Sequence, residues 1–303
     1  WISYQALEQL KVKGFLQEMG WLAEQIQLTL TQIISRAVYP FSELRTSRWI
    51  QENSAVCEIT GYPIEKITKD KLYQNALKLY EIKDRLEQHL SKRTNELFDI
   101  TDRIVLYDLT NTYFEGEKRN SKLARFGKSK EKRNDAKLVV LALVINPQGF
   151  IKYSNIFEGN TADDTTLPMI IDSLRVKTST NAQKALVVLD AGIATEKNLE
   201  LIKAKGYDYV CVSRSALKDY KPAEGTTPVE MLTKGKQTLT LQRVSNGLET
   251  DFYLEVKSPG KQLKEGSMKN QFETRFEENL ERIKLGLTKK YSTKRADKVN
   301  QRI

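Results

Sequence analysis

The first hundred residues carry apolar side chains at the spacing of amphipathic helices. Over 21–38 these side chains recur every four positions and stop before Pro40, a residue that cannot continue a helix. Ser42 can cap a short helix that follows. Over 72–90 the same spacing returns, with lysines and arginines on the other side, so one long helix is expected there. The pattern indicates a helical region over residues 1–100.

Beyond residue 103 short apolar runs replace the helical spacing. Runs of this kind are typical of strands in a buried sheet. They predict strands over 104–107, 137–145, 150–157, 185–189 and 209–213. Helices over 166–174 and 195–205 separate the later strands. The resulting order, β-β-β-α-β-α-β, is that of an RNase H-like fold.

After residue 213 the strand signals weaken and a charged helix follows. Two alternating segments, 237–244 and 250–257, flank an Asn-Gly dipeptide that favours a hairpin turn. Residues 263–287 carry apolar side chains at helical spacing among many charges. We therefore expect an α/β protein with an RNase H-like mixed sheet. The first part of its catalytic core is expected over 101–215. A β-rich insertion with a charged helix is expected over 216–303, so that the core is completed beyond the chain end.

The net charge of the chain and its distribution indicate what kind of molecule the protein binds. Apolar residues make up 40% of the chain and the mean hydropathy is -0.51, values typical of a globular protein. The net charge of +10 favours nucleic acid, or less often an anionic membrane surface. Residues 117–137 hold nine lysines and arginines against three acids, and 257–303 hold thirteen against six. A single run of this kind is usually a solvated surface, but two beside an α/β core favour phosphate binding.

Other residue types exclude several classes of protein. Cys57 and Cys211 form no metal-binding or disulfide pattern and are expected to be small buried residues in a reducing compartment. His89 is the only histidine, which argues against histidine-based hydrolases and most zinc sites. The chain has no uncharged apolar run of membrane-spanning length. We expect no membrane partner and a cytoplasmic location.

Two aspartates close predicted strands. Asp108 follows the first strand and Asp190 follows the fourth, so they become neighbours if those strands lie side by side. Taken singly, each aspartate could equally mark a turn. As a pair in this order of elements they favour binding of Mg²⁺ or Mn²⁺, which prefer oxygen ligands. Two such ions can activate a water or a 3′-hydroxyl for phosphoryl transfer.

Three stretches carry a specific resemblance. Residues 107–115 read YDLTNTYFE, 157–168 read FEGNTADDTTLP and 188–192 read VLDAG. In this order they resemble the first-aspartate, third-strand and second-aspartate motifs of one branch of bacterial insertion-sequence DDE transposases. The loop 125–129 and the helical stretch 40–97 are also similar to that family.

The resemblance implies a transposase that uses Mg²⁺ or Mn²⁺ to cleave DNA and transfer strands, with Asp108 and Asp190 as catalytic metal ligands. The family's third acid is a later glutamate, which we leave unassigned because Glu277 and Glu278 resemble its insertion-region helix. We therefore expect the chain alone to bind DNA and to cleave it little.

Lys122, Arg125, Lys128, Lys130 and Arg133 are expected to contact phosphates of the DNA. The implied partners are element-end and target DNA and a second copy in a synaptic complex, near the nucleoid of a bacterial cell. The alternatives are a related RNase H-like nuclease and an inactive DNA-binding fragment.

Overall fold

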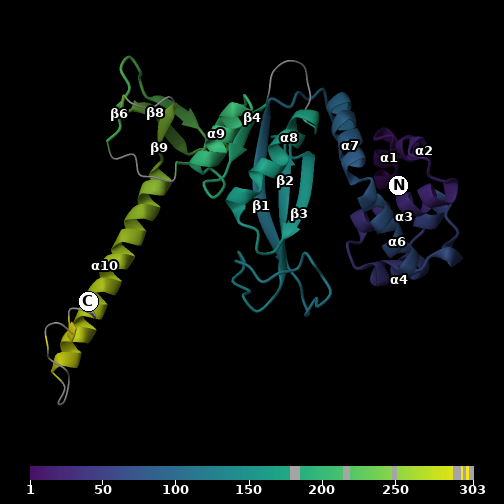
Figure 1. Cartoon of the computed structure of the whole chain (residues 1–303), viewed down its shortest axis with the longest axis horizontal. Coiled ribbons are helices and arrows are strands. Elements are labelled where there is room, and N and C mark those ends of the chain that lie inside the picture. The colour runs from purple at the N-terminus through teal and green to yellow at the C-terminus, as the bar shows by residue number, and fades with distance from the viewer. Residues whose placement is uncertain (178–184, 214–218, 248–250, 289–294, 296–297, 300–303) are drawn as a thin grey trace. The chain divides into compact units, whose positions relative to one another are not determined.

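The chain folds into two compact units, Trp1–Arg214 and Ser215–Ile303. The computed structural model describes residues 1–177, 185–213, 219–247, 251–288, 295 and 298–299. The first unit holds the helical region and a five-stranded sheet. The second holds a smaller sheet and a long helix (Figure 1).

The helical region packs around its own apolar core. Its helices are α1 (Ile2–Gln9), α2 (Val12–Glu18), α3 (Ala23–Val38), α4 (Glu43–Asn53), α5 (Val56–Thr60), η1 (Ile64–Lys66), α6 (Lys69–Glu81) and α7 (Lys83–Phe98). Leu16, Ile50 and Leu72 are completely buried at the centre of this core. Ser42 caps α4 as expected, because its hydroxyl accepts a hydrogen bond from the backbone N–H of Arg45.

The long helix expected over 72–90 is wrong in one respect, since the helix breaks at Ile82. That residue leaves helical geometry with φ -100° and ψ 10°, and α6 and α7 lie on either side of it. The break allows α6 to pack on α3 and α4 while α7 packs against the strand β3. Tertiary packing therefore overrides a continuous apolar spacing.

The larger sheet has the strand order β3-β2-β1-β4-β5. Its strands are β1 (Ile104–Tyr113), β2 (Leu138–Ile145), β3 (Ile151–Glu158), β4 (Leu186–Leu189) and β5 (Tyr209–Cys211). β1, β2 and β3 are antiparallel neighbours, and β4 runs parallel to both β1 and β5. Helices η2 (Asp163–Thr165), α8 (Leu167–Lys177) and α9 (Glu196–Ala204) connect the later strands. The predicted order of elements is present, and the fourth strand lies beside the first.

One face of this sheet carries the main core. Alternate residues of β1 and β2 are buried there against Ile170, Ile171 and Leu174 of α8. The residues between them, on the other face, are half-buried or exposed. The expected end of the first strand at Asp108 is wrong, because β1 pairs with β2 as far as Tyr113.

The second unit is built on β8 (Thr238–Ser245). It pairs antiparallel with β6 (Lys221–Pro222), β7 (Val229–Leu232) and β9 (Tyr253–Lys257). β8 and β9 are the two strands of the expected hairpin, although its residues 248–250 lie outside the described part. β6 and β7 were not predicted, because all of their residues are exposed and no alternation marks them.

The charged helix expected near the end is α10 (Pro259–Leu287), which Ser258 caps. Although α10 is the longest helix, its apolar residues are interrupted by many charges. Across the described ranges, no helix combines the length and the apolar content that a membrane crossing requires.

Candidate active site

Asp108 and Asp190 occupy neighbouring positions on parallel strands. The parallel register pairs Tyr107 of β1 with Leu189 of β4, and Asp108 and Asp190 directly follow these two residues in the sequence. Adjacent strands lie about 4.8 Å apart, so the two aspartate backbones start side by side. Both preceding residues are buried and both aspartates are exposed, which places the two side chains on the face away from the core. The structure thus places the two aspartates that the sequence singled out next to each other on adjacent strands.

Local hydrogen bonds hold both aspartates. Asp108 Oδ1 accepts a hydrogen bond from the Leu109 N–H at 2.7 Å. The backbone carbonyl of Asp190 accepts hydrogen bonds from the N–H groups of Ile193 and Ala194, both at 3.1 Å. These bonds close a tight turn directly after β4, which fixes where the Asp190 side chain leaves the sheet.

A third carboxylate, that of Asp163, lies beside Asp190. A Cβ built at Gly192 would be 3.4 Å from Asp163 Oδ2 and 3.6 Å from Asp190 Oδ2. The absent side chain of Gly192 therefore leaves the space between the two carboxylates open. Sequence reasoning assigned Asp163 no role, and its place in the stretch 157–168 was the one signal that could have found it.

The hydroxyl of Tyr107 connects β1 to the segment that carries Asp163. Tyr107 is buried in the core, and its hydroxyl donates a hydrogen bond to Thr166 Oγ1 at 2.7 Å. Burial raises the pKa of the Tyr107 hydroxyl, and the nearby carboxylates of Asp163 and Asp108 raise this pKa further, while the bond to Thr166 opposes them. Tyr107 is therefore a fixed hydrogen-bond donor that stays protonated, and the carboxylates of Asp163 and Asp108 are close enough to raise its pKa.

The basic loop is fastened to the end of the sheet. The Asn111 side chain donates to the Lys128 carbonyl at 3.1 Å and accepts from the Lys130 N–H at 3.3 Å. The Lys130 ammonium group donates to the carbonyl of Leu109, the residue after Asp108. Gly127 packs so closely against the backbone of Gly159 that a Cβ on Gly127 would lie 2.0 Å from the Gly159 carbonyl oxygen. The loop is thus a fixed wall and not a loose surface segment.

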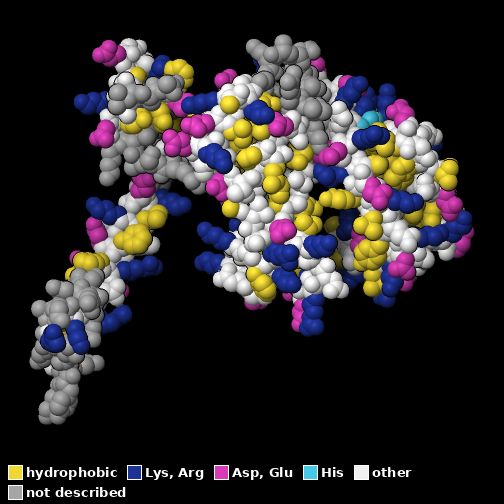
Figure 2. Space-filling model, viewed as in Figure 1, with side chains coloured by type: hydrophobic (Ala, Val, Ile, Leu, Met, Phe, Trp, Pro, Cys, Tyr) yellow, Lys and Arg dark blue, Asp and Glu magenta, His cyan; other side chains and the backbone are white. Residues whose placement is uncertain are grey.

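The five basic residues predicted to bind DNA differ in their surroundings. Arg125 lies 3.5 Å from Glu158, and Arg133 lies 2.9 Å from Asp135 and over the ring of Tyr113. Within the described part of the chain, the ammonium groups of Lys122 and Lys128 have no ion-pair partner and are exposed. Figure 2 shows Lys and Arg side chains gathered at the end of the sheet where this loop lies.

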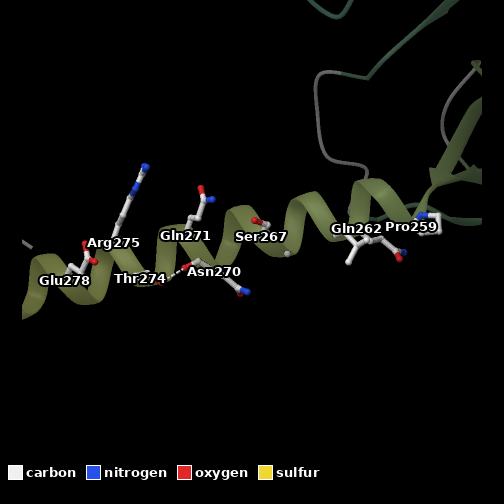
Figure 3. A pocket seen from close by; sticks show the side chains of 10 residues that line it. Pro259, Gln262, Ser267, Asn270, Gln271, Thr274, Arg275 and Glu278 are labelled. Carbon is white, nitrogen blue, oxygen red and sulfur yellow. Dashed lines mark hydrogen bonds between the residues drawn. The ribbon is translucent and has the colours of Figure 1, made fainter. Parts of the chain in front are cut away.

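A cleft of about 650 Å³ lies beside the basic loop, and Asp163 and Asp164 are the carboxylates that line it. Its lining includes Lys128 and Lys130 of the basic loop together with Asp163 and Gly192. By contrast, a hollow along α10 is lined by side chains of that helix alone, Glu278 among them (Figure 3). That hollow is one exposed side of a helix, so the cleft beside Asp190 is the better candidate for a site.

The donor groups at the cleft fit Mg²⁺ or Mn²⁺. Asp163 lines the cleft, Asp108 directly precedes its lining residue Leu109 in the sequence, and Asp190 lies two residues before its lining residue Gly192. All three offer carboxylate oxygens, the ligands that these hard cations prefer, and the lining of the cleft brings no sulfur or imidazole ligand. In the described residues, no three His, Cys, Asp or Glu side chains already stand grouped as a metal site. Glu277 and Glu278 lie on α10 in the second unit.

Comparisons with known proteins show which family this chain matches. Residues 100–284, more than half of the chain, match the family described as transposase DDE domain. The chain matches no curated protein sequence. Among solved structures it is similar to the Mos1 transposase paired-end complex with left transposon end, at 11% identity and a TM-score of 0.26. That similarity covers 56% of this chain and 58% of the Mos1 chain.

A second similar structure is the Mos1 strand transfer complex, at 10% identity and a TM-score of 0.25. It is matched over 59% of this chain and 56% of its own chain. The chain thus spans less than two thirds of either Mos1 chain.

Proposed function

The chain belongs to the family of transposase DDE domains, and on this premise we propose that it cuts DNA at the ends of a mobile element and joins the freed 3′ ends to target DNA. One observation carries the proposal. The parallel register of β1 and β4 sets Asp108 and Asp190 side by side, on the exposed face of the sheet and next to a cleft with a basic wall.

We propose that the five-stranded sheet is an RNase H-like core. Its order, with three antiparallel strands followed by two parallel strands on the other side of β1, supports this assignment. Because the two aspartates start from adjacent hydrogen-bonded strands, their separation is set by the sheet and not by a flexible loop. Rigid placement of this kind is what a catalytic centre needs, since a small misplacement of reacting groups costs much of the rate.

In this mechanism Asp108 and Asp190 would hold Mg²⁺ or Mn²⁺. Such ions, when bound, activate the attacking oxygen and stabilise the leaving oxygen of the phosphodiester. Lys128 and Lys130 line the same cleft as Asp163, and their positive charge would attract the phosphate backbone and orient it toward the carboxylates. Asn111 holds both lysines in place through the loop backbone.

The proposed partners follow from this chemistry. They are element-end DNA, target DNA and a second copy of the chain, since two ends must be brought together. We place the protein in the bacterial cytoplasm, at the nucleoid.

In a protein that also carries the family's later glutamate, Asp108→Asn and Asp190→Asn should each lower metal-dependent nicking of element-end DNA at least ~100-fold, because loss of a metal ligand removes several kcal/mol of barrier reduction. Binding of the DNA should persist. Asp172→Asn, which changes an exposed aspartate on α8, is the control and should nick like the unchanged chain. Equal nicking by all variants would refute the proposal. DNA binding without nicking by any of them, including the unchanged chain, would favour an inactive binding fragment.

Lys122→Gln combined with Lys128→Gln should weaken DNA binding on every sequence. Each lost phosphate contact lowers the slope of log K against log salt by about 0.9, so a reduction near 2 is expected. The comparison is Arg125→Gln with Arg133→Gln, which should change the slope less, because these arginines are already paired with acids. A drop in affinity on one sequence alone, with the slope unchanged, would mean that the loop reads bases instead.

A further inference from the structure

We infer that Asp163 is a third carboxylate directed at the metal site of Asp108 and Asp190, held there by a dedicated set of buried polar side chains. The inference rests on the proposed function and deepens it, because it adds a ligand from the loop after β3 to the two that the sheet provides.

Asp163 faces the space in front of Asp190. Its Oδ2 and that of Asp190 lie 3.4 and 3.6 Å from one point, the position of a Cβ on Gly192, and no side chain from Gly192 separates them. Asp163 also lines the cleft together with Thr110, which is two residues after Asp108 on the same face of β1. Asp163 therefore stands at the same end of the sheet as both aspartates.

Two hydroxyl groups tie the backbone of Asp163 to the first strand. The Tyr107 hydroxyl donates to Thr166 Oγ1, and Thr166 Oγ1 donates to the Asp163 carbonyl, each at 2.7 Å. Tyr107 and Thr166 are buried, so neither hydroxyl has bulk water as an alternative partner. Because Tyr107 directly precedes Asp108, this relay sets the place of Asp163 relative to that carboxylate.

A buried asparagine ties the same turn to the fourth strand. The Asn198 side-chain amide donates to the Asp164 carbonyl and to the Ile193 carbonyl, both at 2.8 Å. Ile193 closes the turn after Asp190, so one amide spans the two segments that carry Asp163 and Asp190. Asn198 is 2% exposed. The turn around Asp163 is therefore fixed at two points, one beside each aspartate of the sheet.

Like charges explain why the three carboxylates are not already grouped. Without a cation they repel one another, and an exposed aspartate turns its carboxylate toward water. The fixed backbone keeps Asp163 within reach, and rotation about its side-chain bonds brings the carboxylate onto an ion held by the other two. Asp164 is a matched neighbour: it is exposed and lines the cleft, but its carboxylate lies more than 4 Å from the position of a Cβ on Gly192.

The test is calorimetric titration of the 303-residue chain with Mn²⁺ in the absence of DNA, so that activity plays no part. Asp163→Asn should lower Mn²⁺ affinity about 10-fold to 100-fold, the range for groups that hold or orient a bound metal. Asp164→Asn should change it little, and Asp163→Glu should restore much of it. Tyr107→Phe, which breaks the relay and leaves every carboxylate in place, should give a smaller loss.

Thermal unfolding with a metal chelator present distinguishes whether Asp163 is a metal ligand or a residue that only stabilises the fold. Asp163→Asn should unfold at the same temperature as the unchanged chain or higher, since it removes one of three like charges, and should lose the stabilisation that Mn²⁺ adds. Lower stability in the chelator would overturn the inference.

Asp108→Asn and Asp190→Asn distinguish the two proposals. If both lose Mn²⁺ binding while Asp163→Asn binds normally, the inference fails and the proposed function stands. If none of the three changes Mn²⁺ binding, or if the unchanged chain does not bind the ion, both fail.

Discussion

Replacement of Gly159 by alanine should cost at least about 3 kcal/mol of folding free energy, a value reached when backbone has to move to admit an atom. A Cβ on Gly159 would lie 2.1 Å from the Leu138 carbonyl oxygen and 2.6 Å from the Arg125 carbonyl oxygen. Both neighbours are backbone atoms, and Arg125 and Leu138 are joined by two hydrogen bonds of 3.1 and 2.8 Å. The basic loop would have to leave the sheet.

Urea unfolding followed by circular dichroism measures this loss. Gly14→Ala is the matched control, because Gly14 lies in α2 and a Cβ there meets nothing within 4 Å. That variant should gain about 0.5–1 kcal/mol, since alanine loses less conformational freedom in a helix. If Gly159→Ala were as stable as Gly14→Ala, the close packing of loop and sheet would be disproved.

Lys152→Met should destabilise the first unit by about 3–5 kcal/mol, the range for breaking a buried ion pair. Lys152 and Asp102 have completely buried side chains, and their charged groups lie 2.9 Å apart. The Lys152 ammonium group also donates to Asn95 Oδ1 at 2.7 Å and to Ser91 Oγ at 3.1 Å, both on α7. Methionine removes the positive charge and leaves the Asp102 carboxylate buried without a counter-ion.

A double-mutant cycle with Asp102→Asn tests the origin of this loss. The double variant should lose less stability than the sum of the two single losses, because neither charge then remains alone. The exposed pair Lys205–Asp172 is the comparison, and its disruption by Lys205→Met should cost no more than about 1 kcal/mol. A loss that small for Lys152→Met would show that water reaches the pair.

Short apolar runs were sufficient to predict where the strands of the larger sheet lie, because strands in a buried sheet carry apolar side chains along most of their length. Asp108 shows the limit of that reasoning. Its polar side chain marks the end of the apolar run, yet β1 continues to Tyr113, since an aspartate on the exposed face does not interrupt pairing with β2. The break at Ile82 has no glycine or proline to signal it, so it could be found only from the packing of α6 and α7.

Of the candidate site, the sequence predicted only the part where β1 and β4 lie side by side. Asp108 and Asp190 could be paired from the order of the strands, because a parallel register makes their ends neighbours. Asp163 and Asn198 could not, since a turn and a helix come together there through hydrogen bonds between segments more than thirty residues apart. Lys152 was equally hidden, because a lysine in a strand is normally exposed and here its partner lies fifty residues earlier.

The position of α7 along β3 also bears on how the sheet avoids self-association. An outermost strand offers unpaired backbone groups to other chains, and this invites aggregation. On β3, the Ser154 carbonyl accepts a hydrogen bond of 2.5 Å from the Lys83 ammonium group of α7, and α7 packs against the strand. The opposite border, β5, is only three residues long, although Val210 and Val212 beside it are 52% and 68% exposed. At the β3 border Lys83 therefore competes with any incoming strand for the Ser154 carbonyl, and the β5 border is too short to pair with a neighbour over more than a few residues.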